Sequence, residues 1–109
     1  MSKFEFGQIV LPEFPFTNGG THKKRPAIVL ADTNDGDLIL ARITSQTYSS
    51  KYDIIVSDWQ QAGLKLESII RLHKIATLES SLVIKKMGVL SSADMKKTKE
   101  LINSILDNA

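Results

Sequence analysis

Hydrophobic positions alternate with polar ones over most of this chain and then change to a helical spacing near the C-terminus. Alternation with a period of two is typical of strands that bury one face. Up to about residue 90 it predicts six strands, at Gln8–Leu11, Ala27–Ala31, Leu38–Ile43, Tyr52–Val56, Ser68–Leu72 with a continuation toward Thr77, and Val83–Val89. Short strands at this spacing favour a small closed barrel over an open sheet.

Two connections between the strands carry clear turn signals. Asn34-Asp35-Gly36-Asp37 predicts a tight hairpin turn, because Asn, Asp and Gly tolerate the positive φ that such turns need. Ser57–Ala62 predicts a single helical turn that Gly63 stops, with Trp59 as a core side chain.

The C-terminal segment predicts an amphipathic helix. Ser91 and Asp94 form a capping-box pattern. The positions that repeat at intervals of three and four residues after it are Met95, Thr98, Leu101, Ile102, Ile105 and Leu106. We therefore expect one domain over residues 1–109, with the barrel at about residues 4–90 and the helix at about residues 92–107, its lysines forming a solvated face.

The amino-acid composition limits the kinds of functional site that this chain can form. The chain has 14 cationic and 12 acidic side chains, a formal net charge of +2, so a surface that binds a polyanion must be local. The absence of cysteine excludes disulfides, thiolate nucleophiles and the usual structural zinc sites, and two distant histidines give no metal set, so we expect no cofactor. No segment reads as a membrane span or an apolar signal, which predicts a cytoplasmic protein.

The segment between the first two strands is the first candidate site. It contains Gly19 and Gly20, then three consecutive cations, Lys23, Lys24 and Arg25, directly before Pro26. The proline pushes Arg25 toward an extended conformation, and the planar guanidinium offers paired hydrogen bonds to phosphate oxygens. The alternative is a solvated hairpin loop that happens to be basic.

A second candidate group ends the third strand. Thr44, Ser45 and Gln46 place two hydroxyls and an amide where the strand opens into a loop. Such groups hydrogen-bond phosphate oxygens or base edges. They are also ordinary turn residues, which is the competing interpretation.

The third candidate is the pair Arg71 and His73. Strand alternation predicts that both lie on one face, where an imidazole that titrates near neutrality and a permanent positive charge suit phosphodiester cleavage. The alternative is that Arg71 pairs with a carboxylate such as Asp53 or Asp58 while His73 covers the surface.

Taken in order, these motifs resemble the PemK/MazF toxins over nearly the whole chain. The matching pieces are Gly7-Gln8-Ile9-Val10, Phe14-Pro15-Phe16-Thr17, Lys24-Arg25-Pro26-Ala27, Ile43-Thr44-Ser45, Ser68 to Arg71 and Ile75-Ala76-Thr77-Leu78. The resemblance implies an SH3-like barrel of the type shared with CcdB and Kid, and a two-fold homodimer. It also implies a metal-independent endoribonuclease that cuts single-stranded mRNA and is neutralised by a small antitoxin protein.

The resemblance also implies roles for residues. In MazF-like members the catalytic pair is the arginine of the Arg-Pro motif and a threonine at the end of the third strand, which here are Arg25 and Thr44. In Kid-like members an arginine and an aspartate two residues apart are the acid and base. Arg71 matches that arginine, but His73 stands in place of the aspartate.

The mechanism that we expect uses the 2′-hydroxyl of the RNA as nucleophile. Arg25 and Arg71 then stabilise charge on the phosphorane, His73 is the base, and Thr44 with Ser45 holds the non-bridging oxygens. The expected RNA-binding residues are Phe16, Thr17, His22, Lys23, Lys24, Ser45 and Gln46. Phe16 and Tyr48 are candidates to stack on unpaired bases.

A competing hypothesis is a non-catalytic module, either a CcdB-like inhibitor or a degraded toxin that only binds a protein. The two hypotheses differ in geometry. The catalytic one requires Arg25, Thr44, Arg71 and His73 to converge in one groove.

Overall fold

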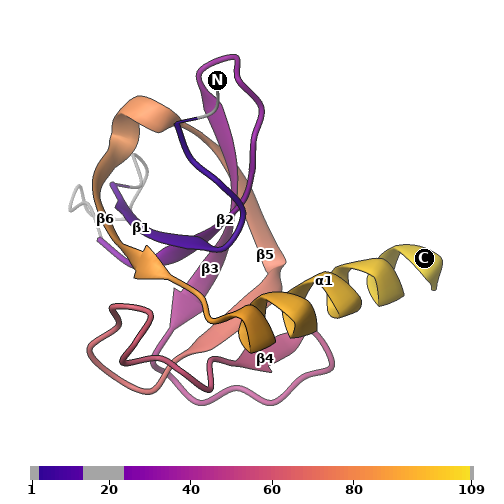
Figure 1. Ribbon diagram of the computed structural model, residues 1–109. Coiled ribbons are helices and arrows are strands. Elements are labelled where there is room, and N and C mark those ends of the chain that lie inside the picture. The colour runs from indigo at the N-terminus through magenta and orange to yellow at the C-terminus, as the bar shows by residue number, and fades with distance from the viewer. Residues whose placement is uncertain (1–2, 14–23, 109) are drawn as a thin grey trace, which may run out of the picture.

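The computed structural model describes residues 3–13 and 24–108. Figure 1 shows how the strands and the C-terminal helix are arranged. The elements are β1 (Gln8–Pro12), β2 (Ala27–Asp32), β3 (Asp37–Thr44), β4 (Asp53–Ile55), β5 (Ile69–Glu79), a short 3-10 helix (Ser80–Leu82), β6 (Val83–Val89) and α1 (Ser92–Asp107). Four predicted RNA-binding residues, Phe16, Thr17, His22 and Lys23, lie outside the described residues.

The strands form one antiparallel sheet in the order β4-β5-β3-β2-β1-β6, which curls round on itself (Figure 1). The mainly β fold with a C-terminal helix is confirmed. The predicted closure is wrong, because β4 and β6 are the edges of the described sheet and do not pair with each other. No hydrogen-bonded strand pairing closes the barrel at β6. The backbone of Gly63 packs against β6 instead, so closely that a Cβ atom built on Gly63 would lie 2.1 Å from the carbonyl oxygen of Met87.

Apolar side chains are buried on both faces of the curled sheet. One core cluster includes Ile28, Ile43 and Ile70, and the apolar face of α1 packs on it. The other cluster, on the opposite face, includes Val29 and Leu40. Burial of successive residues on both faces explains why β2 is apolar without alternation from Ala27 to Ala31.

Local signals in the sequence define the turns and the helix ends. Asn34 has φ 62° and Gly36 has φ 95°, which confirms the hairpin turn. The hydroxyl of Ser91 accepts a hydrogen bond from the Asp94 N–H at 3.2 Å, and the helix spans the predicted residues. Residues 57–63 form hydrogen-bonded turns in place of a regular helix, with Trp59 partly buried against the core.

The ladder between β3 and β5 contains a large irregularity. Ala41 pairs with Ile75, but Arg42 pairs with Arg71, so residues 72–74 have no partner on β3. The N–H of Leu72 donates instead to the carbonyl of Tyr52, just before β4, at 3.0 Å. A bulge of this kind bends a strand and redirects its side chains.

No helix in residues 3–13 or 24–108 is both long enough and apolar enough to cross a bilayer.

Candidate functional site

The register of β2 on β3 brings Arg25 and Thr44 together. Ala27 lies across from Arg42, and the N–H of Ile43 donates to the carbonyl of Pro26 at 3.1 Å, one residue beyond the end of β2. The next residue pair in this antiparallel register is Arg25 and Thr44. Because Pro26 and Ile43 form the hydrogen-bonded pair, Arg25 and Thr44 are a non-hydrogen-bonded pair, in which opposite side chains share a face at close range.

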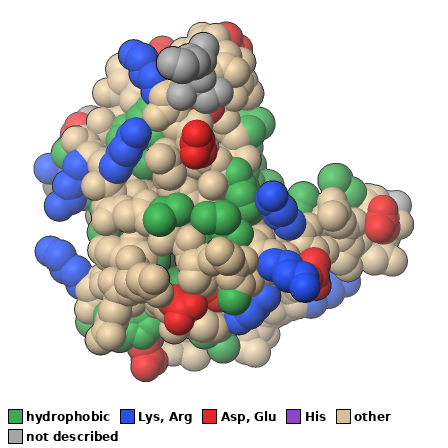
Figure 2. Space-filling model, viewed as in Figure 1, with side chains coloured by type: hydrophobic (Ala, Val, Ile, Leu, Met, Phe, Trp, Pro, Cys, Tyr) green, Lys and Arg blue, Asp and Glu red, His purple; other side chains and the backbone are tan. Residues whose placement is uncertain are grey.

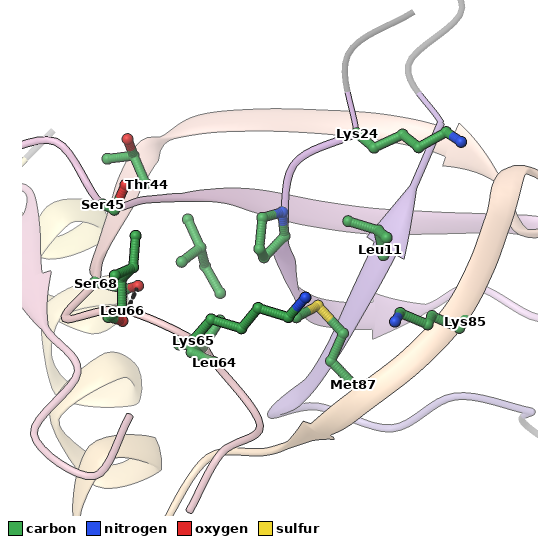
Figure 3. A pocket seen from close by; sticks show the side chains of 12 residues that line it. Leu11, Lys24, Thr44, Ser45, Leu64, Lys65, Leu66, Ser68, Lys85 and Met87 are labelled. Carbon is green, nitrogen blue, oxygen red and sulfur yellow. Dashed lines mark hydrogen bonds between the residues drawn. The ribbon is translucent and has the colours of Figure 1, made fainter. Parts of the chain in front are cut away.

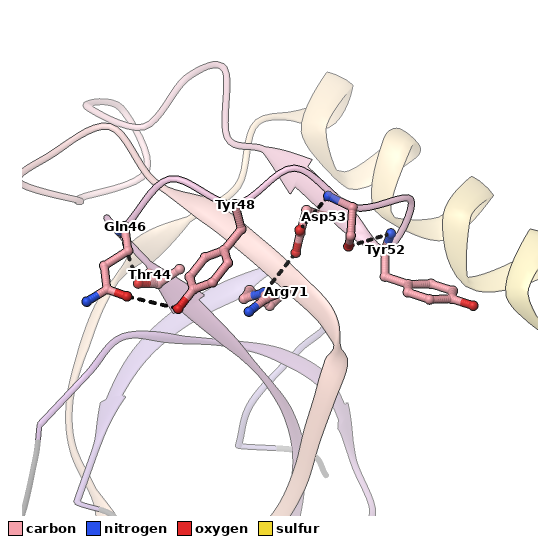
Figure 4. A network of polar contacts seen from close by, with 7 residues as sticks. Thr44, Gln46, Tyr48, Tyr52, Asp53 and Arg71 are labelled. Atoms are coloured by element: carbon pink, nitrogen blue, oxygen red, sulfur yellow. Dashed lines mark hydrogen bonds and ion pairs between the residues drawn. The ribbon is translucent and has the colours of Figure 1, made fainter.

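Thr44 begins a short chain of polar contacts (Figure 4). Its hydroxyl accepts a hydrogen bond from the Gln46 N–H at 3.1 Å, and the Gln46 side-chain oxygen accepts one from the Tyr48 hydroxyl at 2.9 Å. Thr44 is only 7% exposed, whereas Ser45, Gln46 and Tyr48 are exposed. The end of β3 therefore presents polar groups from a loop whose backbone is held in place.

A cavity of about 300 Å³ lies beside this loop (Figure 3). Three lysines from three different segments line it: Lys24 before β2, Lys65 before β5, and Lys85 on β6. The hydroxyl-bearing residues on its wall are Thr44, Ser45 and Ser68, and the apolar ones are Leu11, Pro26, Ile43, Leu64, Leu66 and Met87. A cationic rim over an apolar lining suits a ligand that is anionic at one end and flat or apolar at the other.

Arg71 is engaged by two neighbours (Figure 4). Its Nε donates to the Asp53 carboxylate at 3.0 Å, and its guanidinium lies 3.7 Å from the centroid of the Tyr48 ring. Burial raises the pKa of the Asp53 carboxyl, but hydrogen bonds from Ser50 and Arg71 outweigh it and hold that pKa below its usual range. The ion pair with Asp53 that the sequence left open is confirmed, and it compensates the charge of Arg71.

His73 does not join the other predicted catalytic residues, which corrects the alternation argument. Its ring lies 5.3 Å from that of Tyr52, and it lines a separate apolar cavity between β5 and the C-terminal part of α1, together with Ile102 and Ile105. The cause is the bulge at residues 72–74, which breaks the alternation between Arg71 and His73. The structure thus brings Arg25, Thr44 and Arg71 to one face and places His73 elsewhere. The four-residue convergence that the catalytic hypothesis required is therefore met by three of the residues only, and a catalytic site here needs a base other than His73.

Sequence reasoning missed two residues near Thr44. Arg42 is exposed, lies two positions before Thr44 on β3, and is directly opposite Arg71 on β5. Alternation along β3 was the signal that would have found it. Lys65 lines the cavity, but it stands between Leu64 and Leu66 in a segment without periodicity, so no sequence signal pointed to it.

The side chains around the site are mostly positively charged and act as hydrogen-bond donors. Figure 2 shows Lys and Arg side chains standing out along the side of the molecule that carries β1 and β6. Asp53, the carboxylate beside Arg71, is occupied by that pair. Among residues 3–13 and 24–108, no group of three or more His, Asp or Glu side chains is placed to hold a metal ion. The described part of the site is suited to an anion.

The Asp53–Arg71 pair gives a stability prediction. We expect Asp53→Asn to lower the free energy of unfolding by about 1–3 kcal/mol, because it leaves a partly buried guanidinium without its carboxylate. The Asp53 pKa is lowered in the folded state, so its contribution is present above pH 4 and is lost as the pH falls through the folded-state value. Urea unfolding at pH 7 and pH 3 measures both effects.

The matched control for this prediction is Glu67→Gln, which removes an exposed carboxylate. The difference in stability between Asp53→Asn and the wild type should shrink at pH 3, whereas Glu67→Gln should match the wild type at both pH values. An Asp53→Asn protein as stable as the wild type at pH 7 would contradict the role of this ion pair.

Comparison with known proteins agrees with this geometry. Residues 5–106 match the family model of the PemK-like, MazF-like toxins of type II toxin-antitoxin systems. None of the curated proteins matches the sequence.

Three solved structures show the shared fold at low sequence identity. An endoribonuclease from a mycobacterial species aligns with a TM-score of 0.76 at 14% identity, over 98% of this chain and 94% of that one. Toxin MazF-mt6 of Mycobacterium tuberculosis aligns with a TM-score of 0.75 at 17% identity, over 92% and 96%. A MazE–MazF structure from Deinococcus radiodurans aligns with a TM-score of 0.76 at 14% identity, over 96% of each chain. With the family model matching nearly every residue, the chain belongs to the PemK-like, MazF-like toxins of type II toxin-antitoxin systems.

Proposed function

We propose that this toxin is an endoribonuclease that cleaves single-stranded RNA, mRNA in the cell, without a metal ion. The observation that carries the proposal is the register of β2 on β3, which sets Arg25 across from Thr44, a residue that lines the cavity with the rim of lysines. A permanent cation next to a hydroxyl on rigid strands can hold a phosphodiester and stabilise the charge that develops on it. Structures of similar fold that are described as endoribonucleases support the same reaction.

The reaction uses the ribose 2′-hydroxyl as its nucleophile. The 2′-hydroxyl loses its proton to a base and its oxygen attacks the adjacent phosphorus, while the bond to the 5′-oxygen breaks and that oxygen takes up a proton from water. The products are a 2′,3′-cyclic phosphate and a 5′-hydroxyl. Arg25 stabilises the extra charge of the phosphorane, and the Thr44 hydroxyl, already oriented by the Gln46 N–H, donates a hydrogen bond to a non-bridging oxygen. Arg71, paired with Asp53, acts on the site by holding the Tyr48 ring in place in the loop that follows Thr44.

Removal of the 2′-proton requires a base, and the chain has two imidazoles. His73 faces the apolar cavity beside α1. His22 lies outside the described residues, and in the sequence it stands three positions before Arg25. We therefore assign proton removal to His22 in this proposal and give His73 no part in it.

This assignment makes the two histidine variants differ. His22→Ala should lower kcat by about 10²–10⁴, which is the usual contribution of a general base, and should abolish the acid limb of the pH–rate profile. His73→Ala should cleave within about threefold of the wild type, because its ring packs on Tyr52 away from the groove. Steady-state cleavage of one RNA between pH 5 and pH 8 measures both. A profile that loses its acid limb only in His73→Ala would return the base role to His73.

The remaining parts of the proposal concern partners. The protein acts in the cytoplasm as a homodimer, and a cognate antitoxin protein neutralises it. Solved structures of the same fold in complex with an antitoxin support this partner.

The proposal is tested by incubating purified wild-type protein with a long single-stranded RNA in the presence of a chelator. Cut positions and end groups are then mapped. Discrete cuts that leave cyclic phosphate and 5′-hydroxyl ends support the proposed function. Intact RNA across several unrelated sequences would contradict it and favour a toxin that only binds protein.

A further inference from the structure

The arginines at 25, 42 and 71 are the only arginines of the chain, and the register of the sheet sets them on one face. Arg25 lies across from Thr44, and Arg42 lies across from Arg71. Arg42 and Thr44 are two positions apart on β3, so their side chains leave the strand on the same side. One strongly basic strip therefore crosses β2, β3 and β5.

The charges on this strip are not equivalent. Arg71 has a carboxylate partner at 3.0 Å, its side chain is only 16% exposed, and Tyr48 covers its guanidinium. Arg42 is exposed and has no ion pair or hydrogen bond from its side chain within residues 3–13 and 24–108. The sequence of residues 14–23 contains no Asp or Glu that would compensate it. Arg42 is a solvated cation beside Thr44, whereas the charge of Arg71 is already neutralised.

The spacing along β3 matches a single-stranded nucleic acid. Two residues of a strand span about 6.6 Å, which is comparable to the separation of neighbouring phosphates in an extended single strand. A phosphate held between Arg25 and Thr44 would therefore have its neighbour within reach of Arg42. The planar guanidinium can make two parallel hydrogen bonds to that phosphate.

We propose that Arg42 binds the RNA phosphate next to the one that is cleaved, and so fixes the position of the strand along β3. This inference rests on the proposed function and deepens it. It makes Arg42 a binding residue, because it touches the substrate but not the reacting phosphorus.

The test begins with the wild-type cut site, mapped as above. An RNA oligonucleotide that spans this cut site, and in which the attacking 2′-hydroxyl is replaced by a 2′-O-methyl group, should bind to the protein without being cut. Arg42→Gln should weaken its binding about tenfold and reduce the magnitude of the slope of log affinity against log salt by about 0.7, the loss of one phosphate contact to a single strand. Arg42→Lys should recover part of the affinity. The control is Lys96→Gln, which removes one exposed positive charge from α1 and should match the wild type.

A modified RNA locates the contact. Replacing the single phosphate next to the cut site by a neutral methylphosphonate should weaken binding of the wild type and leave Arg42→Gln unaffected. In cleavage of the unmodified RNA, Arg42→Gln should raise KM and change kcat by less than threefold. Equal effects of the methylphosphonate on both proteins would contradict the role of Arg42 and leave the proposed function standing. The same holds if the Arg42→Gln protein binds as tightly as Lys96→Gln. A wild type that neither binds nor cuts RNA would instead contradict the proposed function.

Discussion

Arg25→Ala is expected to lower kcat/KM for RNA cleavage by about 10³ while leaving the protein folded. The reason is that Arg25 is the cation set directly across from Thr44 by the pairing of Pro26 with Ile43. Removal of one preorganised donor to a developing oxyanion commonly costs 10²–10³ in rate, and here the donor also carries a full charge. Arg25→Lys should recover only part of the loss, since an ammonium cannot reproduce the paired hydrogen bonds of a guanidinium.

Lys24→Ala is the control for this variant. Lys24 is the neighbouring cation and lines the cavity, but it stands on the rim, so its loss should weaken RNA binding by less than tenfold, and the effect should fade as salt is raised. Thermal unfolding of each variant checks that neither change is structural. An Arg25→Ala protein that cleaves within threefold of the wild type would remove Arg25 from the mechanism.

Gly63→Ala is expected to have the largest effect on stability, a loss of about 3 kcal/mol or more in the free energy of unfolding. Gly63 has φ 89°, a conformation that costs an L-residue about 1–2 kcal/mol. A Cβ at this position would also lie 2.1 Å from the Met87 carbonyl oxygen, so the turn or β6 must move. Both segments contribute to the cavity, through Leu64 and Met87, so RNA cleavage should fall as well.

The chain offers a matched control in Gly36→Ala. Gly36 has φ 95°, but no heavy atom lies within 4 Å of a Cβ built there, so only the conformational cost remains, about 1 kcal/mol. Urea unfolding of the two variants separates the close contact from the backbone conformation. Equal destabilisation by both changes would show that the approach of Gly63 to β6 does not contribute.

Periodicity and local turn chemistry were sufficient to predict the elements of this fold. Each predicted strand is present, and β6 and α1 have the predicted bounds. Closure of the barrel was not predictable in this way, because it depends on how the ends of the sheet meet. At β6 the approach of Gly63 to Met87, a contact between residues far apart in the sequence, takes the place of a ladder.

Only part of the candidate site was predicted, because the prediction relied on regular pairing of the strands. Arg25 and Thr44 stand at the ends of adjacent strands, so their proximity follows from regular antiparallel pairing. The prediction for His73 assumed the same regular pairing. However, β5 contains a bulge at residues 72–74, and no local residue pattern predicts it. Lys65 enters the cavity from an irregular segment, where neither period applies.

Attack by the 2′-hydroxyl beside Arg25 and Thr44 requires that hydroxyl at the cut position, which a single substitution in the RNA can remove. An RNA that carries a single 2′-deoxy residue at the mapped cut position is compared with the unmodified strand, in chelator. The account predicts that the wild type cuts the unmodified RNA there, leaving a cyclic phosphate, and leaves the deoxy position intact while other sites in the same strand are still cut. Cleavage at the deoxy position at an undiminished rate would contradict it.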